Sequence, residues 1–189
     1  MAVLKIARMG HPVLRGRAEA VEDVSALEIH ALVADMMETL ADIGGAGLAA
    51  PQVYMPLRVV LFHVPAERIA EEPRAEPVGW TVLINPVVTP LNEKTELGWE
   101  GCLSVPGLRG VVPRYTRVRY GGMTLDGEKI TCEASGFHAR VVQHECDHLD
   151  GVLFPMRMID LSLLSFTGEL HHGLADQVAA RRDTAGNIP

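Results

Sequence analysis

The spacing of apolar residues changes from helical to strand-like after residue 45, and this change constrains the fold more strongly than any other feature of the chain. Between Ser25 and Ile43, apolar residues recur three and four positions apart, which predicts a helix with one apolar face. Ser25 and Glu28 match the capping-box pattern of a helix start. Gly44-Gly45 is expected to end the helix, because glycine permits the positive φ of a helix C-terminus.

The segments after this helix are short, rich in β-branched residues and bounded by prolines, as strands are. We expect strands at 58–64, 80–85, 115–124 and 129–133. The polar, proline-rich stretch 65–79 predicts a surface loop between the first two strands. Asp126-Gly127 predicts a tight hairpin between the last two.

Two more helices are expected in the second half of the chain. One covers Phe137–Leu149 and ends at Asp150-Gly151, the other covers Leu161–Ala180, and residues 173–189 are expected to form a frayed tail. Strands flanked by helices, without a βαβ rhythm, indicate an α+β fold. We therefore predict mostly antiparallel β-sheets packed around the central 137–149 helix, with an N-terminal and a C-terminal helix, in one domain over residues 1–189.

Charge and hydropathy argue against several classes of protein. The formal net charge of −7 disfavours the broad basic face that binds nucleic acid. No apolar run approaches the roughly 18–20 residues that span a bilayer, and we find no export or transit signal at the N-terminus. Three scattered cysteines predict reduced thiols rather than a disulfide framework. We therefore expect a cytoplasmic protein without a membrane partner.

Residues 144–148 read HECDH, an HExxH sequence inside the second expected helix. His144 and His148 are four apart, so they share a helical face and can bind one metal ion. Glu145 lies beside them, within reach of a water molecule on that metal. The alternative is a surface helix that carries these residues by chance.

An open catalytic metal site needs a third protein ligand. The candidates are Cys102, Glu169, His171 and His172. Cys102 lies between glycines and a proline, where a strand end or turn is expected, although a neutral thiol is often only a small buried hydrophobe. Glu169 lies downstream, where zinc endopeptidases of the gluzincin type keep their third ligand. Cys146 faces about 200° away from His144 around the helix, and Cys132 has no neighbouring ligand, so both are expected to be structural.

The glycine-rich stretch 44–52 is the third feature of interest. Its small residues let another backbone approach closely. Gln52 follows a rigid proline and offers an amide donor and acceptor. The alternative is a flexible turn after the first helix.

Three segments in this order and spacing carry a resemblance to a known family: GLAAPQ at 47–52, EGCLS at 100–104 and QHECDH at 143–148. Together they resemble peptide deformylase, the enzyme that removes the N-formyl group from nascent bacterial and organellar proteins. The resemblance runs from Ile6 to about Phe154. It implies hydrolysis of an N-formyl-methionyl polypeptide to formate and a free amino terminus.

The resemblance also implies the roles of several residues. The metal would be bound by Cys102, His144 and His148. Glu145 would be the catalytic base, and Gln52 with the backbone N–H of Leu103 would contact the formyl oxygen. Fe²⁺ is implied by the family alone, with Zn²⁺, Ni²⁺ or Co²⁺ as replacements, whereas the general affinity order favours zinc over iron.

An apolar pocket for the methionine side chain is expected at Ala46, Gly47, Phe137 and Val141. Phe137 and Val141 are four apart on one helical face. Asp147 is expected to pair with Arg114, which the resemblance places near this helix. Two residues depart from the family pattern: Ala46 stands where a larger aliphatic residue is usual, and Arg140 where many members are aliphatic.

Two alternative functions remain at this level. One is a gluzincin-like zinc endopeptidase that uses Glu169, and the other is a metal-binding or redox-sensing module centred on Cys102. The expected partners are nascent formylated polypeptides. A transient ribosome contact stays open, because Glu169 and Asp176 dilute the basic character that a docking C-terminal helix has in some family members.

Overall fold

The computed structural model describes residues 2–70 and 75–172. The helices are α1 (Leu27–Ile43) and α2 (Gly136–Leu149). The strands are β1 (Gly47–Ala49), β2 (Val59–Val64), β3 (Val78–Pro90), β4 (Thr95–Cys102), β5 (Val105–Tyr115), β6 (Arg117–Met123), β7 (Lys129–Ser135) and β8 (Ser165–Phe166). Short 3₁₀ turns cover Pro12–Leu14, Ala50–Val53, Ala66–Arg68, Phe154–Arg157, Leu161–Leu163 and Thr167–Glu169.

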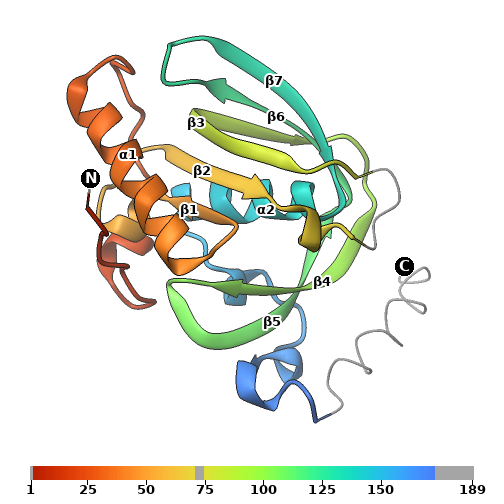
Figure 1. Cartoon of the computed structure of the whole chain (residues 1–189). Helices are drawn as coiled ribbons and strands as arrows, with labels where there is room; N and C mark the ends of the chain where they lie inside the picture. Colours follow the sequence, from red (N-terminus) through yellow and green to blue (C-terminus); the bar gives the residue numbers. More distant parts are fainter. Residues whose placement is uncertain (1, 71–74, 173–189) are drawn as a thin grey trace.

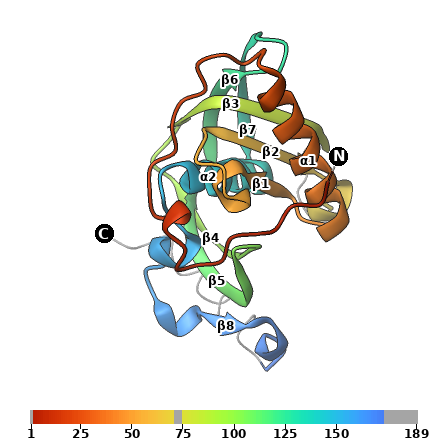
Figure 2. The ribbon, with the colours of Figure 1, turned by 90° about the vertical axis from the view of Figure 1, so that its left-hand side faces the viewer.

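The strands form two antiparallel sheets, with α2 between them (Figure 1). The larger sheet has the order β1-β2-β3-β6-β7, and the smaller has the order β4-β5-β8. The view in Figure 2 shows β8 beside β5, at the opposite end of the molecule from β6. The predicted α+β fold, with antiparallel sheets around the HExxH helix, is therefore confirmed. In the described residues, no helix is long and apolar enough to cross a membrane.

The expected strand at 115–124 is divided between the two sheets. β5 ends at Tyr115 and β6 starts at Arg117, while the N–H of Thr116 donates to the carbonyl of Lys94 at 2.9 Å. The alternating pattern is the same on both sides of this junction, so it does not reveal that the chain changes sheet. The hairpin between β4 and β5 was also not predicted, because its glycines and prolines interrupt the alternation. The hairpin at Asp126-Gly127 is present between β6 and β7.

The predicted start of the first helix was wrong. Ala26, and not Ser25, is the N-cap residue of α1. Asp23 accepts hydrogen bonds from both the N–H (2.9 Å) and the hydroxyl (2.6 Å) of Ser25, so a local turn engages the serine before the helix begins. The predicted end is confirmed, since Gly44 has a φ of 76° and its N–H donates to Leu40.

The prediction of a C-terminal helix over 161–180 is also wrong for residues 161–172, the part of this range that the structure describes. Residues 161–169 form two 3₁₀ turns separated by β8, whose Ser165 and Phe166 pair with β5. Leu163 is buried against Val111 of β5, so this segment packs on the sheet as a strand and turns rather than as a helix. Residues 173–189, which include the expected tail, lie outside the described residues.

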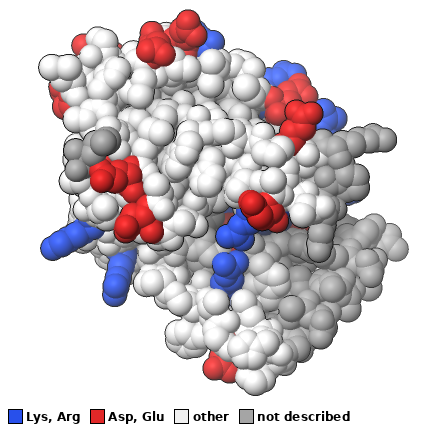
Figure 3. Space-filling view, in the orientation of Figure 1, with Lys and Arg blue, Asp and Glu red and all other residues white. Residues whose placement is uncertain are grey.

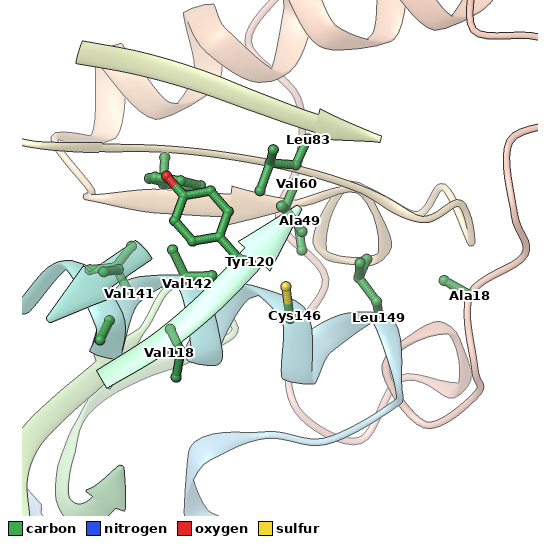
Figure 4. Packing of buried hydrophobic residues seen from close by; sticks show 13 residues of the cluster. Ala18, Ala49, Val60, Leu83, Val118, Tyr120, Val141, Val142, Cys146 and Leu149 are labelled. Carbon is green, nitrogen blue, oxygen red and sulfur yellow. The ribbon is translucent and has the colours of Figure 1, made fainter. Parts of the chain in front are cut away.

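The core lies on both faces of the larger sheet. Successive residues of β2 point to opposite faces: Val60 and Phe62 pack toward α2, whereas Val59 and Leu61 pack toward α1. Cys146 lies within the first of these clusters, near Val60 and Leu149 (Figure 4), as a structural cysteine should. Each fully buried aliphatic side chain stabilises the fold by about 1.5–3 kcal/mol. This packing fixes one face of α2 and leaves its other face for the cleft.

Candidate active site

Two histidines of α2 and one cysteine of β4 lie close together. His144 and His148 lie one turn apart on the helix, and Cys102 is the last residue of β4. Their ligand atoms all lie within 4.8 Å of one another, and Cys102 Sγ is 3.3 Å from His148 Nε2. Within the described residues, this is the group of three or more such side chains that can hold a metal ion. The structure therefore brings together the Cys102, His144 and His148 set that the resemblance implied.

Glu100 is a site residue that the sequence analysis missed. Its Oε2 lies 2.8 Å from Nδ1 of His144. A carboxylate in this position keeps the proton on Nδ1 and leaves Nε2 as the free electron-pair donor. Glu100 lies two residues before Cys102 on β4, but its partner His144 lies 44 positions further along the chain, so the sequence carries no local signal of this contact.

Arginines surround the Glu100 carboxylate. Arg114 donates to it through two nitrogens, at 2.9 and 3.0 Å, and Arg140 adds a contact at 2.9 Å. Burial by itself would raise the pKa of Glu100, but the hydrogen bonds from His144 and Arg114 outweigh burial and hold the pKa well below its ordinary value. Glu100 therefore stays ionised and continues to accept from His144.

The expected pair between Arg114 and Asp147 is present. A terminal nitrogen of Arg114 lies 2.6 Å from Asp147 Oδ2, and both side chains are largely buried. Arg157 also donates to Asp147, at 2.7 and 3.1 Å. Asp147 is thus paired with two arginines, and its contact with Arg114 connects the helix to β5.

Glu145 lies beside the ligand group with its carboxylate buried. Its Oε2 has no hydrogen-bond partner in the described part of the chain. Burial raises the pKa of Glu145 to about 7, which suits a group that accepts and returns a proton near neutral pH. A Cβ at Gly47 would overlap this carboxylate, so the glycine is needed for space rather than for backbone conformation.

Gln52 is fixed by its neighbours with its amide nitrogen toward the ligands. Its Oε1 accepts from the N–H of Ala49 at 2.9 Å. Its Nε2 lies 3.2 Å from Ser104 Oγ and 3.4 Å from Cys102 Sγ. Leu103 follows Cys102 in the turn between β4 and β5 and lines the same cleft.

A cleft of about 520 Å³ opens beside these residues. Its walls include the four predicted pocket residues: Ala46, Gly47, Phe137 and Val141. The guanidinium of Arg68 lies 5.9 Å from the ring centre of Phe137 at the wall of the cleft. Acidic and basic side chains are interspersed over the face shown in Figure 3, and most of that face is uncharged.

The remaining candidate ligands lie elsewhere. Glu169 and His172 are 3.6 Å apart, with side chains 65% and 72% exposed, and they do not belong to the ligand group. His171 is likewise exposed. The gluzincin alternative is therefore not favoured. Cys132 is exposed on β7, while Cys146 is buried in the core.

The fold and the site together define a class, the α+β hydrolases that carry an HExxH helix. Residues 3–163 match the model of the polypeptide deformylase family, and the chain belongs to that family. Peptide deformylase 1 of Nitrosomonas europaea is 52% identical over 168 residues, which cover 89% of this chain and 94% of the relative. Peptide deformylase 1 of Prochlorococcus marinus is 48% identical over 188 residues, which cover 98% and 96%.

Solved structures agree with the sequence relatives. The peptide deformylase of Ehrlichia chaffeensis matches with a TM-score of 0.78 and 29% identity, covering 98% of this chain and all of that one. A class I type b peptide deformylase from Acinetobacter baumannii matches with a TM-score of 0.76 and 38% identity, covering 84% of this chain and all of that one. The chain is thus an enzyme that removes the N-formyl group from nascent polypeptides.

Proposed function

We propose that Cys102, His144 and His148 bind one divalent metal ion, Fe²⁺ in the native enzyme, and that Glu145 moves the protons of the reaction. The convergence of one thiol and two imidazoles within 4.8 Å carries this proposal. The donor set suits Fe²⁺ and Zn²⁺ alike, and Ni²⁺ or Co²⁺ can replace them. The hydrogen bond of His144 Nδ1 to Glu100 directs the second ring nitrogen toward the metal position, so the residues fit the ion.

When bound, the metal ion acts as a Lewis acid that lowers the pKa of a water molecule, so that this water can lose a proton and attack the formyl carbon at neutral pH. Glu145 takes the proton of the attacking water on its unpartnered Oε2. The same carboxyl group then gives this proton to the leaving amine of the polypeptide. Its burial keeps bulk water away from the transfer.

Gln52 and Leu103 stabilise the charge that develops on the formyl oxygen. Hydrogen-bond donors aimed at such an oxygen act as an oxyanion hole. The contacts of Gln52 with Ala49 and Ser104 hold its Nε2 in place before substrate binds, which supports this role. The backbone N–H of Leu103 is the second donor.

The methionine side chain of the substrate enters the apolar part of the cleft. Its walls are Ala46, Gly47, Phe137 and Val141. A deformylase from Acinetobacter baumannii has been solved with Met-Ala-Ser bound, which supports a cleft that accepts a peptide with an N-terminal methionine. A formyl group occupies little space, so the narrow site beside Gly47 admits it and excludes larger acyl groups.

We further propose that the chain works as one catalytic domain over residues 1–189, in the cytoplasm, where formylated chains emerge from ribosomes. Its partners are then nascent polypeptides, with any ribosome contact transient. The position of every proposed site residue between 46 and 148 supports the single domain.

The metal proposal predicts a distinct response to air. Enzyme purified anaerobically with Fe²⁺ should show the highest turnover of formyl-Met-Ala and should lose it in air, because ferrous iron and a thiolate ligand are both oxidisable. Zinc should bind at least as tightly and support less turnover. Metal analysis and formate release, measured on the same samples, check this. An air-stable enzyme that is most active with Zn²⁺ would contradict the iron assignment.

A variant of the thiol ligand tests the site itself. Cys102→Ser should lose most of its metal and its turnover together, since the hydroxyl is a far weaker ligand. Cys132→Ser is the matched control, because that thiol is exposed on β7 and does not belong to the ligand group. Unchanged metal content in Cys102→Ser would refute the proposed ligand set.

A further inference from the structure

Arg140 is a largely buried charge at the wall of the cleft that the reaction above does not use. It lies on α2, and its side chain is 13% exposed. Its guanidinium donates to Glu100 Oε1 at 2.9 Å and to the backbone carbonyls of Glu96 (2.8 Å), Val112 (2.8 Å) and Gly98 (3.4 Å). It therefore joins α2 to both strands of the β4–β5 hairpin and to one carboxylate of the site.

Gly98 provides the space that this guanidinium occupies. A Cβ at Gly98 would lie 2.6 Å from both Cζ and a terminal nitrogen of Arg140, closer than real Cβ contacts come. Gly98 has no left-handed φ, so its backbone conformation does not require glycine. The small residue on β4 and the arginine on α2 fit each other sterically.

Glu100 is held from two sides by different arginines. Oε1 accepts from Arg114 and Arg140, while Oε2 accepts from Arg114 and faces His144. Arg114 is also engaged by Asp147 at 2.6 Å on the other side. Arg140 also donates to three backbone carbonyls of β4 and β5, which fix its guanidinium against the sheet.

We propose that Arg140 is a positioning residue for the deformylase reaction, which orients His144 through the Glu100 carboxylate in a space kept open by Gly98. Without Arg140, Glu100 would lose one of the two arginines that hold its carboxylate against His144. Glu100 could then rotate away from His144 Nδ1, and the imidazole would lose its fixed orientation. The inference rests on the ligand set proposed above. Arg140 acts through Glu100 and needs no contact with the reacting atoms.

The test compares Arg140→Met with a surface control. Co²⁺ serves as the probe ion, and its Kd is measured by competition with a chelator on anaerobically prepared protein. Loss of the direct partner of a metal ligand typically weakens metal binding or activity about 10–100-fold. Because Arg140 acts through that partner, we expect a rise in the Co²⁺ Kd toward the lower end of this range, about 10-fold. The kcat for formyl-Met-Ala should fall while KM changes little, because the substrate pocket is intact. Arg119→Met removes an arginine of an exposed ion pair and should leave the Kd and kcat unchanged.

Two further variants separate positioning from folding. Gly98→Ala keeps every hydrogen-bonding group but displaces the guanidinium, so it should raise the Co²⁺ Kd in the same direction as Arg140→Met. The double variant should then be no worse than Arg140→Met alone. Arg140→Lys keeps the charge and one donor nitrogen, and should recover part of the affinity. If Arg140→Met does not fold, Gly98→Ala and Arg140→Lys decide the question.

A purely structural role gives a different result. If the melting temperature of the metal-free variants falls while their Co²⁺ Kd equals that of the wild type, Arg140 supports the fold alone and the proposal is wrong. Failure of the proposed function is distinguishable, because it would appear as wild-type protein that binds Co²⁺ and releases no formate. Failure of the proposed ligand set would appear as tight Co²⁺ binding by His148→Ala.

Discussion

Gln52 and His144 are each oriented by a neighbour that engages one end of the side chain and leaves the other end directed at the site. The carbonyl oxygen of Gln52 is held by Ala49, and Nδ1 of His144 is held by Glu100. Glu145 differs, because its Oε2 is buried without a partner in the part of the chain that the structure describes. A buried carboxylate oxygen without a hydrogen-bond partner lowers the free energy of unfolding, so it destabilises the folded protein. We interpret this cost as part of the catalytic function of Glu145.

Substitution of Glu145 should separate metal binding from chemistry. Glu145→Gln keeps the size of the side chain but removes the proton acceptor, so turnover should fall by at least the ~10²–10⁴-fold that general acid–base catalysis supplies. Metal content should stay near one per chain, because the three ligands are intact. His148→Ala should instead lose metal and activity together. Metal analysis and formate release on purified variants are the measurements.

The exposed Glu133 of β7 supplies the control, and Glu133→Gln should retain both metal and turnover. Loss of metal in Glu145→Gln would show that Glu145 is a ligand. Full turnover in that variant would mean that another group is the base.

The elements of the fold differ in how firmly they are fixed. α2 is packed between two sheets and attached to β5 by Arg114, whose guanidinium joins Glu100 to Asp147. α1 covers the outer face of the larger sheet, and its N-cap residue is Ala26, which has extended backbone angles and no polar side chain. α2 is thus held by buried charges as well as by apolar packing, whereas α1 is held by apolar packing and has an incomplete N-terminus.

Removal of Arg114 should destabilise the whole fold. Arg114→Ala leaves two buried carboxylates, Glu100 and Asp147, without their shared partner, and breaking such a pair costs about 3–5 kcal/mol. Urea unfolding followed by circular dichroism measures the loss. Arg117→Ala removes an arginine whose side chain is 57% exposed and should change the free energy of unfolding by no more than about 0.5 kcal/mol. Equal effects from both variants would exclude a structural role for the buried pair.

The start of α1 can be improved by one substitution. Ala26→Ser places a hydroxyl at the N-cap, where it can accept from a free N–H of the first turn, and should stabilise the protein by about 0.5–2 kcal/mol. Ser25→Ala should not cause a loss of that size, because Ser25 is bound to Asp23 and does not cap the helix. Urea midpoints of the two variants check this. A larger loss in Ser25→Ala than the gain in Ala26→Ser would restore the capping box inferred from the sequence.

At the scale of the whole molecule, the packing of α2 against the larger sheet makes stability depend on pH. His138 of α2 packs against Phe62 of β2 and Tyr120 of β6, and its Nε2 lies 3.2 Å from the Tyr120 hydroxyl. Burial lowers the pKa of His138 below its ordinary value. Protonation therefore favours the unfolded chain, in which histidine titrates near 6.5.

The sign of the effect follows from this pKa. The stability contributed by neutral His138 is fully present above about pH 7 and is lost as pH falls through about 6.5 toward the lower pKa of the folded state. In a plot of the free energy of unfolding against pH, His138→Gln should reduce the slope in this range. The reduction is at most about 1.4 kcal/mol per pH unit, the slope that one proton gives. Urea unfolding of the wild type and of His138→Gln between pH 5 and 8, with the same metal bound, measures the contribution of this residue to the pH dependence. Parallel curves would contradict the assignment.

Part of the proposed catalytic set was readable from local spacing, whereas Cys102, Gln52 and Leu103 followed only from the family resemblance. His144, Glu145 and His148 lie on one turn of a helix, and helical geometry places them together whatever the rest of the fold does. The amphipathic pattern of α1, the glycine at its end and the β6–β7 hairpin are local in the same sense. The α+β class followed from these local features and from the absence of a βαβ rhythm.

The tertiary structure decided the features that depend on contacts between distant segments. Glu100 meets His144 across 44 positions, and Arg140 meets Gly98 across 42, so no local spacing reveals either contact. The change of sheet at Thr116 and the pairing of β8 with β5 were likewise hidden, because strand patterns do not specify their partners. Ser25 does not cap α1, because it is hydrogen-bonded to Asp23 instead of to the first turn of the helix. Spacing along the chain thus determined which residues can react, while packing determined which neighbours orient them.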